Sequence, residues 1–384
     1  MNNSQAEKDS SKSHWINFIK VLAIFAILYL FLVSIGMIGS AFKGLGRGFA
    51  EELIKSSAGP LIGLFIGILT TSLIQSSSTT TSLVVGMVAA GTFGDDPHLA
   101  VAAAVPYIMG ANIGTSVTNT IVSLGHIVKK NEFKRAFAAS IIHDFFNLLS
   151  VLILFPLQLS TGIISNLANA LATFFIGSGT IAFKSPVKMI TKPAVHWISD
   201  LLDKQSFINS NWLLLVLALL FLFLSLRYLT VLIRSLVMSK LEAFFDTHIF
   251  KTALRAILFG IFITVLVQSS SITTSLVIPL AGAGILTLQQ IFPYTLGANI
   301  GTTVTAILAS LVSGTHAPLA VAFSHLIFNV MGIAIIWPVK IIRTIPLRMA
   351  EWFATISLQN RIIPIVYIMI VFYLIPLILI LIVR

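Results

Sequence analysis

The stretch Gln75-Ser-Ser-Ser-Thr-Thr-Thr-Ser82 decides the fold, because it places eight polar side chains in a row inside the apolar stretch 60–91. A second stretch, Gln268-Ser-Ser-Ser-Ile-Thr-Thr-Ser275, repeats seven of its eight residues inside the apolar stretch 256–286. Buried polar groups in hydrocarbon need partners, so such a run is a poor lipid-facing surface. The sequence therefore predicts two re-entrant hairpins that turn at these clusters.

The composition describes a membrane protein. Of the 384 residues, 57% are apolar and 10% are charged, the mean hydropathy is +0.99, and there is no cysteine. Ordinary soluble domains carry about 25% charged residues, so a soluble enzyme is excluded, as are disulfides and thiolate metal sites. The net charge of +11 lies in short loops between apolar runs. This placement indicates the positive-inside rule and a lipid bilayer as partner, with no nucleic acid.

Seven apolar runs are long enough to cross a bilayer at about 20 residues each. The first, Trp15–Ser40, has no evident cleavage site after it and is predicted to be a retained helix. The others are 98–124, 133–157, 211–237, 289–312, 318–339 and 362–383. For 158–178 an interfacial helix and a span both stay open. We expect an all-α polytopic membrane protein.

The chain also repeats itself beyond the polar clusters. The block Gly110–Thr115 matches Gly297–Thr302, and the block His143–Asn147 matches His325–Asn329 in the same order. The loop between these blocks is rich in Lys and Arg in the first unit and has none in the second. The loops are therefore expected on opposite sides of the membrane, which predicts inverted-topology repeats and transport by alternating access.

These patterns divide the chain and orient it. With a cytoplasmic N-terminus, the inner segments hold 15 basic residues and the outer ones 8, and Arg227 stays unassigned. The side of the C-terminus stays open. The expected parts are a disordered cytoplasmic tail (1–14), a first span and connector (15–55), repeat unit 1 (56–157), a linker with an extracellular loop and a span (158–251), repeat unit 2 (252–339), and a cytoplasmic connector with a C-terminal span (340–384).

Each polar cluster has two interpretations. Ser and Thr could simply bond to carbonyls of their own helix and ease close packing. Alternatively, the turn of a broken hairpin exposes oxygens, which suit a hard cation, and the next half-helix begins with free N–H groups, which suit an anion. The recurrence of the cluster in corresponding places favours the functional interpretation.

The Gly-Ala-Asn-Ile-Gly-Thr blocks likewise allow two interpretations. Their glycines are spaced for close helix packing, a weak signal in membrane helices. We favour a break in the transmembrane helix of each unit, where carbonyls and polar side chains coordinate Na⁺. The side chains expected there are Asn112, Thr115, Thr118, Asn299, Thr302 and Thr305.

Asp144 is the one acid of 13 that lies well inside an apolar span. An ionisable residue there is a functional hypothesis by default, and its counterpart in the second unit is Leu326. We expect one extra cation site; a structural pair with a neighbouring span is the alternative.

His143 and His325 are expected to line the pocket, with Asn147 and Asn329 one helical turn further on. For both histidines a structural role is favoured over that of a proton carrier. Adjacent on one helix, His143 and Asp144 are not expected to form a dyad.

Together these blocks resemble the type II sodium–phosphate cotransporter family. The resemblance covers about 55–375 and is carried by both Gln-Ser-Ser-Ser motifs, Met109–Val122, Phe133–Asn147 and Leu296–Leu308. It implies Na⁺-driven uptake of inorganic phosphate, mainly as the divalent anion, bound between the two hairpins. It also implies an electrogenic member with three Na⁺ per phosphate, because Asp144 matches the acid of electrogenic relatives.

The resemblance assigns residues to two ligands. The phosphate residues are Gln75, Ser76, Ser77, Ser78, Thr79, Ser269, Ser270 and Ser271. The resemblance adds Gln268, Ser271 and Asn147 to the Na⁺ residues proposed above. Asp144 is assigned to the third ion. Na⁺ is the coupling ion, and no organic cofactor is expected.

Other functions stay open at this point. A Na⁺-coupled carrier of another oxyanion or of a carboxylate would use the same fold, and a passive channel or scaffold is the alternative from another class. Enzyme motifs such as GxSxG, HExxH and the P-loop are absent. The connector 179–210 lacks the cysteines and long glycosylated loop of animal relatives, which indicates a bacterial inner membrane. The oligomeric state stays open.

Overall fold

The computed structural model describes residues 3–45, 59–115, 117–176, 186–204, 209–244 and 249–383. Within these ranges all regular structure is helical and there is no strand. Seven helices there are long and apolar enough to cross a membrane, and they lie at Phe18–Leu45, Pro97–Leu124, Lys130–Thr161, Ser210–Leu229, Leu288–Ser313, His316–Ile336 and Ile363–Ile382. Each overlaps one of the seven predicted spans, so the prediction of an all-α polytopic membrane protein is confirmed.

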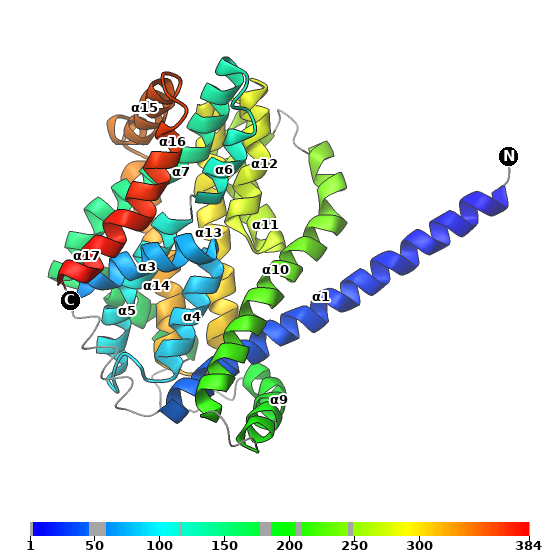
Figure 1. Cartoon of the computed structure of the whole chain (residues 1–384), viewed down its shortest axis with the longest axis vertical. Helices are drawn as coiled ribbons and strands as arrows, with labels where there is room; N and C mark the ends of the chain where they lie inside the picture. Colours follow the sequence, from blue (N-terminus) through cyan, green and yellow to red (C-terminus); the bar gives the residue numbers. More distant parts are fainter. Residues whose placement is uncertain are drawn as a thin grey trace.

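The two polar clusters form helix–turn–helix hairpins. The first pairs α3 (Pro60–Ile74) with α4 (Ser77–Ala89), and the second pairs α11 (Ala253–Val267) with α12 (Ser270–Gly282). At 1.5 Å per residue these helices of 13 to 15 residues are about 20 Å long, too short for a hydrocarbon core of about 30 Å. In Figure 1, α4 leads from the middle of the molecule toward its lower end, whereas α12 leads toward its upper end.

The remaining helices of the repeat units surround the hairpins. The first unit adds α5 (Pro97–Gly114), α6 (Val117–Leu124) and α7 (Lys130–Thr161), and the second adds α13 (Leu288–Ser313) and α14 (His316–Ile336). Helices of one unit pack against the other, since α4 contacts α13 and α12 contacts α7. In Figure 1, α5 and α13 run in opposite directions. These directions agree with inverted repeats, which stay a prediction.

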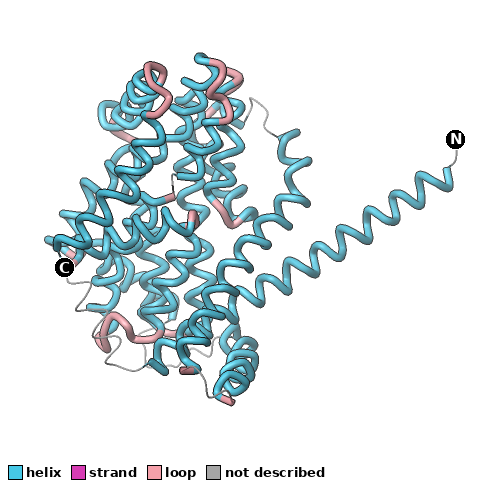
Figure 2. The backbone as a smooth tube through the Cα atoms, viewed as in Figure 1, coloured by secondary structure: helices cyan, strands magenta, loops and turns pink. Residues whose placement is uncertain are grey.

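Non-helical backbone occurs inside the molecule as well as at its two ends (Figure 2). The interior breaks lie at Gln75–Ser76, at Thr115 between α5 and α6, and at Gln268–Ser269. The predicted break of the second transmembrane helix is wrong, because α13 is continuous from Leu288 to Ser313. Only the first unit therefore has a broken transmembrane helix.

The glycines of α13 lie at close contacts with a neighbouring helix. A Cβ on Gly297 would lie 2.0 Å from the Ile257 carbonyl oxygen of α11. A Cβ on the corresponding Gly110 of α5 would lie equally close, at 2.0 Å, to the Leu64 carbonyl oxygen of α3. Both glycines thus let a hairpin helix approach the backbone of a span. The packing interpretation of the Gly-x-x-x-Gly spacing accounts for both units.

The chain outside the repeats forms further helices. α1 (Asn3–Leu45) packs along α10 (Ser210–Phe244) and against α9 (Pro186–Asp203). α1 begins at Asn3, within the predicted tail 1–14, and no Gly or Pro between Asn3 and His14 interrupts the helix. The division of the chain into a tail, connectors and repeat units stays a prediction. Parts of the predicted connectors, residues 46–58, 177–185, 205–208 and 245–248, lie outside the described residues.

The structure defines the helices of 158–178 and of the C-terminal region, while the side of the C-terminus stays open. α7 continues to Thr161 and ends at Gly162, which takes a left-handed conformation with φ of 64°. The next helix, α8 (Ile163–Ile176), is about 21 Å long at 1.5 Å per residue, so 158–178 does not form a full span. The C-terminal region forms α15 (Lys340–Ser357), α16 (Ile363–Ile368), a π-helical segment η2 (Met369–Leu374) and α17 (Ile375–Val383).

Side-chain caps fix where several of these helices begin. Asp96 caps α5: its Oδ1 accepts hydrogen bonds from the backbone N–H of His98 at 2.7 Å and of Leu99 at 3.1 Å. These two bonds hold the pKa of the Asp96 carboxyl below its ordinary value, because they favour the charged form. At α13, Thr287 and Gln290 form a reciprocal capping box.

Candidate functional site

The two hairpin turns have the same local geometry. Gln75 ends α3 and Gln268 ends α11 in the left-handed conformation, both with φ of 56°. Ser76 then caps α4, accepting a hydrogen bond from the Thr79 N–H at 3.2 Å, and Ser269 caps α12 in the same way. The N-termini of two half-helices, with their remaining free N–H groups, therefore lie inside the molecule.

The turns meet at one cavity. Ser78 Oγ of the first hairpin donates to the Gln268 carbonyl oxygen of the second at 3.5 Å. The cavity has a volume of about 250 Å³, and its lining combines both turns with α6 and α10: Ile74, Gln75, Ser76, Ser78, Thr79, Thr118, Phe223, Leu226, Arg227, Val231, Gln268, Ser269, Ser271 and Ile272. Helix N-termini and hydroxyl groups that converge on a cavity are suited to an oxyanion.

An oxygen cluster adjoins the cavity at the second turn. Thr305 Oγ1 of α13 donates to Gln268 Oε1 at 2.7 Å, and Gln268 Nε2 donates to the Val265 carbonyl at 2.6 Å. The Gln268 side chain is thereby fixed with its oxygen toward α13. Among the described residues no group of three or more His, Cys, Asp or Glu could hold a metal ion. Hydroxyl, amide and carbonyl oxygens of this kind fit a hard monovalent cation better than a transition metal.

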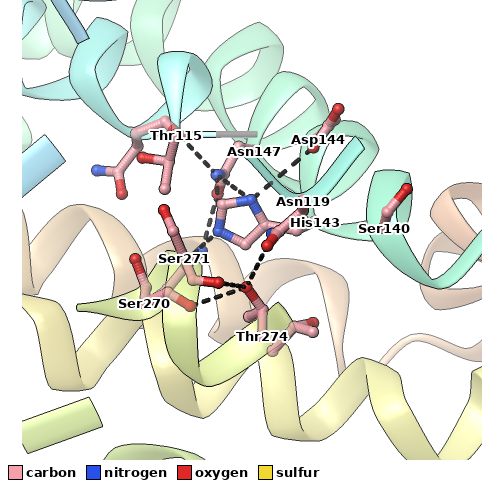
Figure 3. Close-up of polar contacts among 12 residues, drawn as sticks. Thr115, Asn119, Ser140, His143, Asp144, Asn147, Ser270, Ser271 and Thr274 are labelled. Carbon is pink, nitrogen blue, oxygen red and sulfur yellow. Dashed lines mark hydrogen bonds and ion pairs between the residues drawn. The ribbon is translucent and has the colours of Figure 1, made fainter. Parts of the chain in front are cut away.

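A second contact between the units lies beside the cavity. Thr274 Oγ1 of α12 donates to Asn119 Oδ1 of α6 at 3.0 Å and to the Ser270 carbonyl at 2.8 Å (Figure 3). Asn119 is 1% exposed. It was not predicted as a site residue, although an amide within an apolar stretch was the available signal. The bond ties the short helix α6 to the second hairpin.

The predicted histidines form crossed contacts between the units. His143 of α7 is hydrogen-bonded through Nε2 to Asn299 Oδ1 of α13. Reciprocally, His325 Nε2 of α14 lies 3.3 Å from Asn112 Oδ1 of α5. All four side chains are buried. An amide oxygen is an acceptor, so these hydrogen bonds require the histidine tautomer with the proton on Nε2.

The predicted asparagines extend this network. Asn147 Nδ2 donates to the Asn112 carbonyl at 2.9 Å, and Asn299 Nδ2 donates to Asn147 Oδ1 at 2.9 Å. In the second unit, Asn329 Nδ2 donates to the Asn299 carbonyl at 3.3 Å. Because the amides bond within the protein and none of them lines the cavity, a structural role in joining the units accounts for these contacts.

Asp144 lies apart from the cavity. The residue is 2% exposed, and its Oδ2 accepts a hydrogen bond from the Tyr367 hydroxyl of α16 at 3.3 Å. Its Oδ1 lies 4.0 Å from His143 Nδ1, so the two side chains are closer than the sequence predicted for helical neighbours. Figure 3 shows Asp144 on the far side of His143 from Ser270 and Ser271. Tyr367 was missed because it lies outside both repeats.

Several predicted residues do not line the cavity. Ser77 and Ser270 are each 5% exposed and lie outside the lining. Thr115 Oγ1 and Thr302 Oγ1 donate to carbonyls of their own helices, at Ala111 (3.1 Å) and Ala298 (2.9 Å), as the packing interpretation expects. The cavity therefore unites eight of the predicted residues: Gln75, Ser76, Ser78, Thr79, Thr118, Gln268, Ser269 and Ser271.

Comparison with known proteins gives one consistent result. A family model described as "Na+/Pi-cotransporter" matches residues 30–187 and 220–376. The chain is 33% identical to human sodium-dependent phosphate transport protein 2B over 93% of this chain and 64% of that protein. It is also 33% identical to mouse sodium-dependent phosphate transport protein 2A over 93% of this chain and 67% of that protein. The chain thus spans about two thirds of the length of these relatives. No solved structure matches it.

Proposed function

The chain belongs to the Na+/Pi-cotransporter family, and from this premise we propose that it is a symporter that imports inorganic phosphate together with Na⁺. It is a multi-pass membrane protein from a family of transporters, not of enzymes. The observation that carries the proposal is the meeting of both Gln-Ser-Ser-Ser turns at one cavity. A bacterial inner membrane and a cytoplasmic N-terminus belong to the same proposal.

The phosphate is held at the two turns. The N-terminal N–H groups of α4 and α12 and the hydroxyls of Ser76, Ser78, Ser269 and Ser271 donate to its oxygens. A helix N-terminus carries about half a positive elementary charge, so two of them favour the divalent anion over the monovalent one. The hydroxyl groups orient the anion through neutral donors, whose hydrogen bonds are weaker than those of charged donors.

Sodium balances the charge of the anion. Gln268 Oε1 and Thr305 Oγ1 supply oxygens beside the cavity, and Asp144 supplies a carboxylate well inside a span of repeat unit 1. The charges of three Na⁺, one divalent phosphate and one ionised Asp144 sum to zero. The cycle then moves one net charge, which is worth about 2.3 kcal/mol per 100 mV of membrane potential. We therefore propose an electrogenic stoichiometry of three Na⁺ per phosphate.

We propose that the two hairpins provide alternating access. They belong to different repeat units and touch through Ser78 and Gln268, so a small shift of one hairpin against the other opens the cavity on one side. The repeat units contact each other through the buried pairs His143–Asn299 and His325–Asn112. These contacts keep the units aligned during the shift.

The test is uptake of radiolabelled phosphate into proteoliposomes under an imposed Na⁺ gradient and a controlled voltage. We expect uptake with Na⁺ outside, and none when K⁺ or choline replaces Na⁺. Uptake that ignores this replacement would refute coupling to Na⁺. Unlabelled sulfate or a dicarboxylate that competes better than unlabelled phosphate would show that the chain carries another anion.

A matched pair of variants locates the site. Ser271 lines the cavity, whereas Ser275, one turn further along α12, donates to the Ile272 carbonyl at 2.8 Å and does not line it. We expect Ser271→Ala to raise the KM for phosphate several-fold, because one neutral hydrogen bond is worth about 0.5–1.5 kcal/mol. Ser275→Ala keeps the wild-type KM. Equal effects of both substitutions would argue against this cavity as the phosphate site.

A further inference from the structure

The cavity at the hairpin turns has one charged side chain in its lining. This is Arg227, which reaches it from α10, a helix outside both predicted repeat units. It is the only Asp, Glu, Lys or Arg in the apolar segment Ser210–Leu229. Arg227 belongs to neither the inner nor the outer predicted segments. The function proposed above does not use it.

An arginine in a membrane-spanning segment is costly and calls for an explanation. Such residues usually face a water-filled cavity or a partner, or they extend along the helix to the lipid headgroups. Arg227 shares the cavity lining with Ser76, Ser78, Ser269 and Ser271, hydroxyl-bearing residues from both turns. This position favours the explanation that Arg227 faces the cavity and an anion held there. It argues against an arginine that extends to the lipid headgroups.

The charge of Arg227 is available to a ligand. Within the described part of the chain, its guanidinium takes part in no ion pair, and no described carboxylate lines the cavity. The other lining residues supply hydroxyl, amide or apolar groups. An oxyanion that enters the cavity therefore meets one fixed cation together with two helix N-termini. The planar guanidinium matches the spacing of two phosphate oxygens.

We propose that the Arg227 guanidinium binds the transported phosphate in the cavity, as a specificity-determining contact contributed from outside the repeat units. The inference rests on the proposed function, which supplies the phosphate. Arg227 attracts the divalent anion before the Na⁺ sites are filled, when the helix N-termini alone would hold it weakly. Its contribution is therefore largest at low Na⁺ and at mildly alkaline pH, where phosphate is divalent.

The experiment measures phosphate uptake by the full-length chain in phosphatidylcholine proteoliposomes. The variants are Arg227→Gln, which removes the charge, Arg227→Lys, which keeps it but not the planar fork, and Arg361→Gln as a control. Arg361 is an exposed arginine in the turn before α16, away from the cavity. The wild type and these three variants are compared by their KM for phosphate, their maximal rate and their activation by Na⁺.

We expect Arg227→Gln to raise the KM for phosphate by about tenfold at low Na⁺, with a smaller rise at saturating Na⁺, and to leave the maximal rate within about twofold. Arg227→Lys lies between wild type and Arg227→Gln, and Arg361→Gln matches wild type. A wild-type KM in Arg227→Gln overturns the inference while Na⁺-dependent uptake by wild type still supports the proposed function. If wild type shows no such uptake, the proposed function itself fails.

Adding phosphatidylglycerol to the vesicles separates phosphate binding from lipid binding. If Arg227 binds the transported anion, the KM ratio between Arg227→Gln and wild type is the same in both lipids. If Arg227 instead binds a negatively charged lipid headgroup, the variant keeps the wild-type KM and differs in its thermal stability only when the anionic lipid is present. That second result overturns the inference.

Discussion

Gln75 and Gln268 share one backbone conformation, each with φ of 56°, and they are the two non-glycine residues with positive φ in the described part of the chain. A side chain in this left-handed region costs roughly 1–2 kcal/mol. Glycine would avoid that cost, so the glutamine side chain is retained at the expense of stability. At Gln268 the structure gives a reason, since Oε1 accepts the hydrogen bond from Thr305 at 2.7 Å.

The first prediction separates the backbone role of these turns from the side-chain role. Gln75→Gly and Gln268→Gly both keep the turn, so each leaves the free energy of unfolding within about 1 kcal/mol of wild type. Gln268→Gly alone removes the oxygen beside Thr305 and weakens activation of uptake by Na⁺. Thermal unfolding in detergent and Na⁺ titrations of uptake measure the two effects. Unaltered Na⁺ activation in Gln268→Gly would remove Gln268 from the sodium site.

The second prediction concerns close approach of helices. Gly297→Ala places a methyl group 2.0 Å from the Ile257 carbonyl of α11, which must move away. Overpacking of this kind costs about 1–3 kcal/mol, so the midpoint of thermal unfolding falls. Gly39→Ala on α1 is the control, because no atom within 4 Å meets its added Cβ. If both variants melt like wild type, α11 and α13 are not packed as described.

The glycines of α13 illustrate which parts of the fold could be predicted from the sequence and which could not. Hydropathy sufficed for the spans, and the polar clusters sufficed for the hairpin turns, because both depend on local composition. Gly297 and Gly301 are compatible with either a break or close packing, and the packed neighbour, α11, decides which. Tyr367, which contacts Asp144, lies far from it in sequence and outside both repeats, so no pattern could predict the contact. Arg227 was visible as a charge but not as part of a cavity.

The third prediction is a pH dependence at the start of α5. Two backbone N–H groups bond to the ionised Asp96 carboxylate and lower its pKa in the folded protein. A group whose pKa falls on folding stabilises the protein above its unfolded pKa, and this contribution is lost as the pH falls through the folded pKa. Asp96→Asn keeps the cap but does not titrate in this range. The variant should therefore lose less stability than wild type on acidification, as followed by thermal unfolding.

The fourth prediction tests the crossed contacts between the units. His143→Ala leaves the Asn299 amide oxygen without its partner, and a buried group left in this way costs about 1–3 kcal/mol. Adding Asn299→Ala to His143→Ala then costs less than Asn299→Ala costs in wild type. A double-mutant cycle on thermal stability measures this coupling, and the control pair His143 with Asn112 should show a smaller coupling. Additive effects at His143 and Asn299 would contradict the contact.

The fifth prediction assigns the net charge of transport to Asp144. Asp144→Asn is close in size and keeps an acceptor for Tyr367, so the variant folds and retains some phosphate uptake. With the carboxylate gone, the third Na⁺ loses its counter-charge, and uptake becomes insensitive to membrane voltage. Tyr367→Phe is the matched control: it removes the hydroxyl 3.3 Å from Asp144 Oδ2 but keeps the negative charge, so uptake stays voltage-dependent. Simultaneous recordings of current and phosphate flux compare the two. If Asp144→Asn still moves one net charge with each phosphate, the counter-charge lies elsewhere.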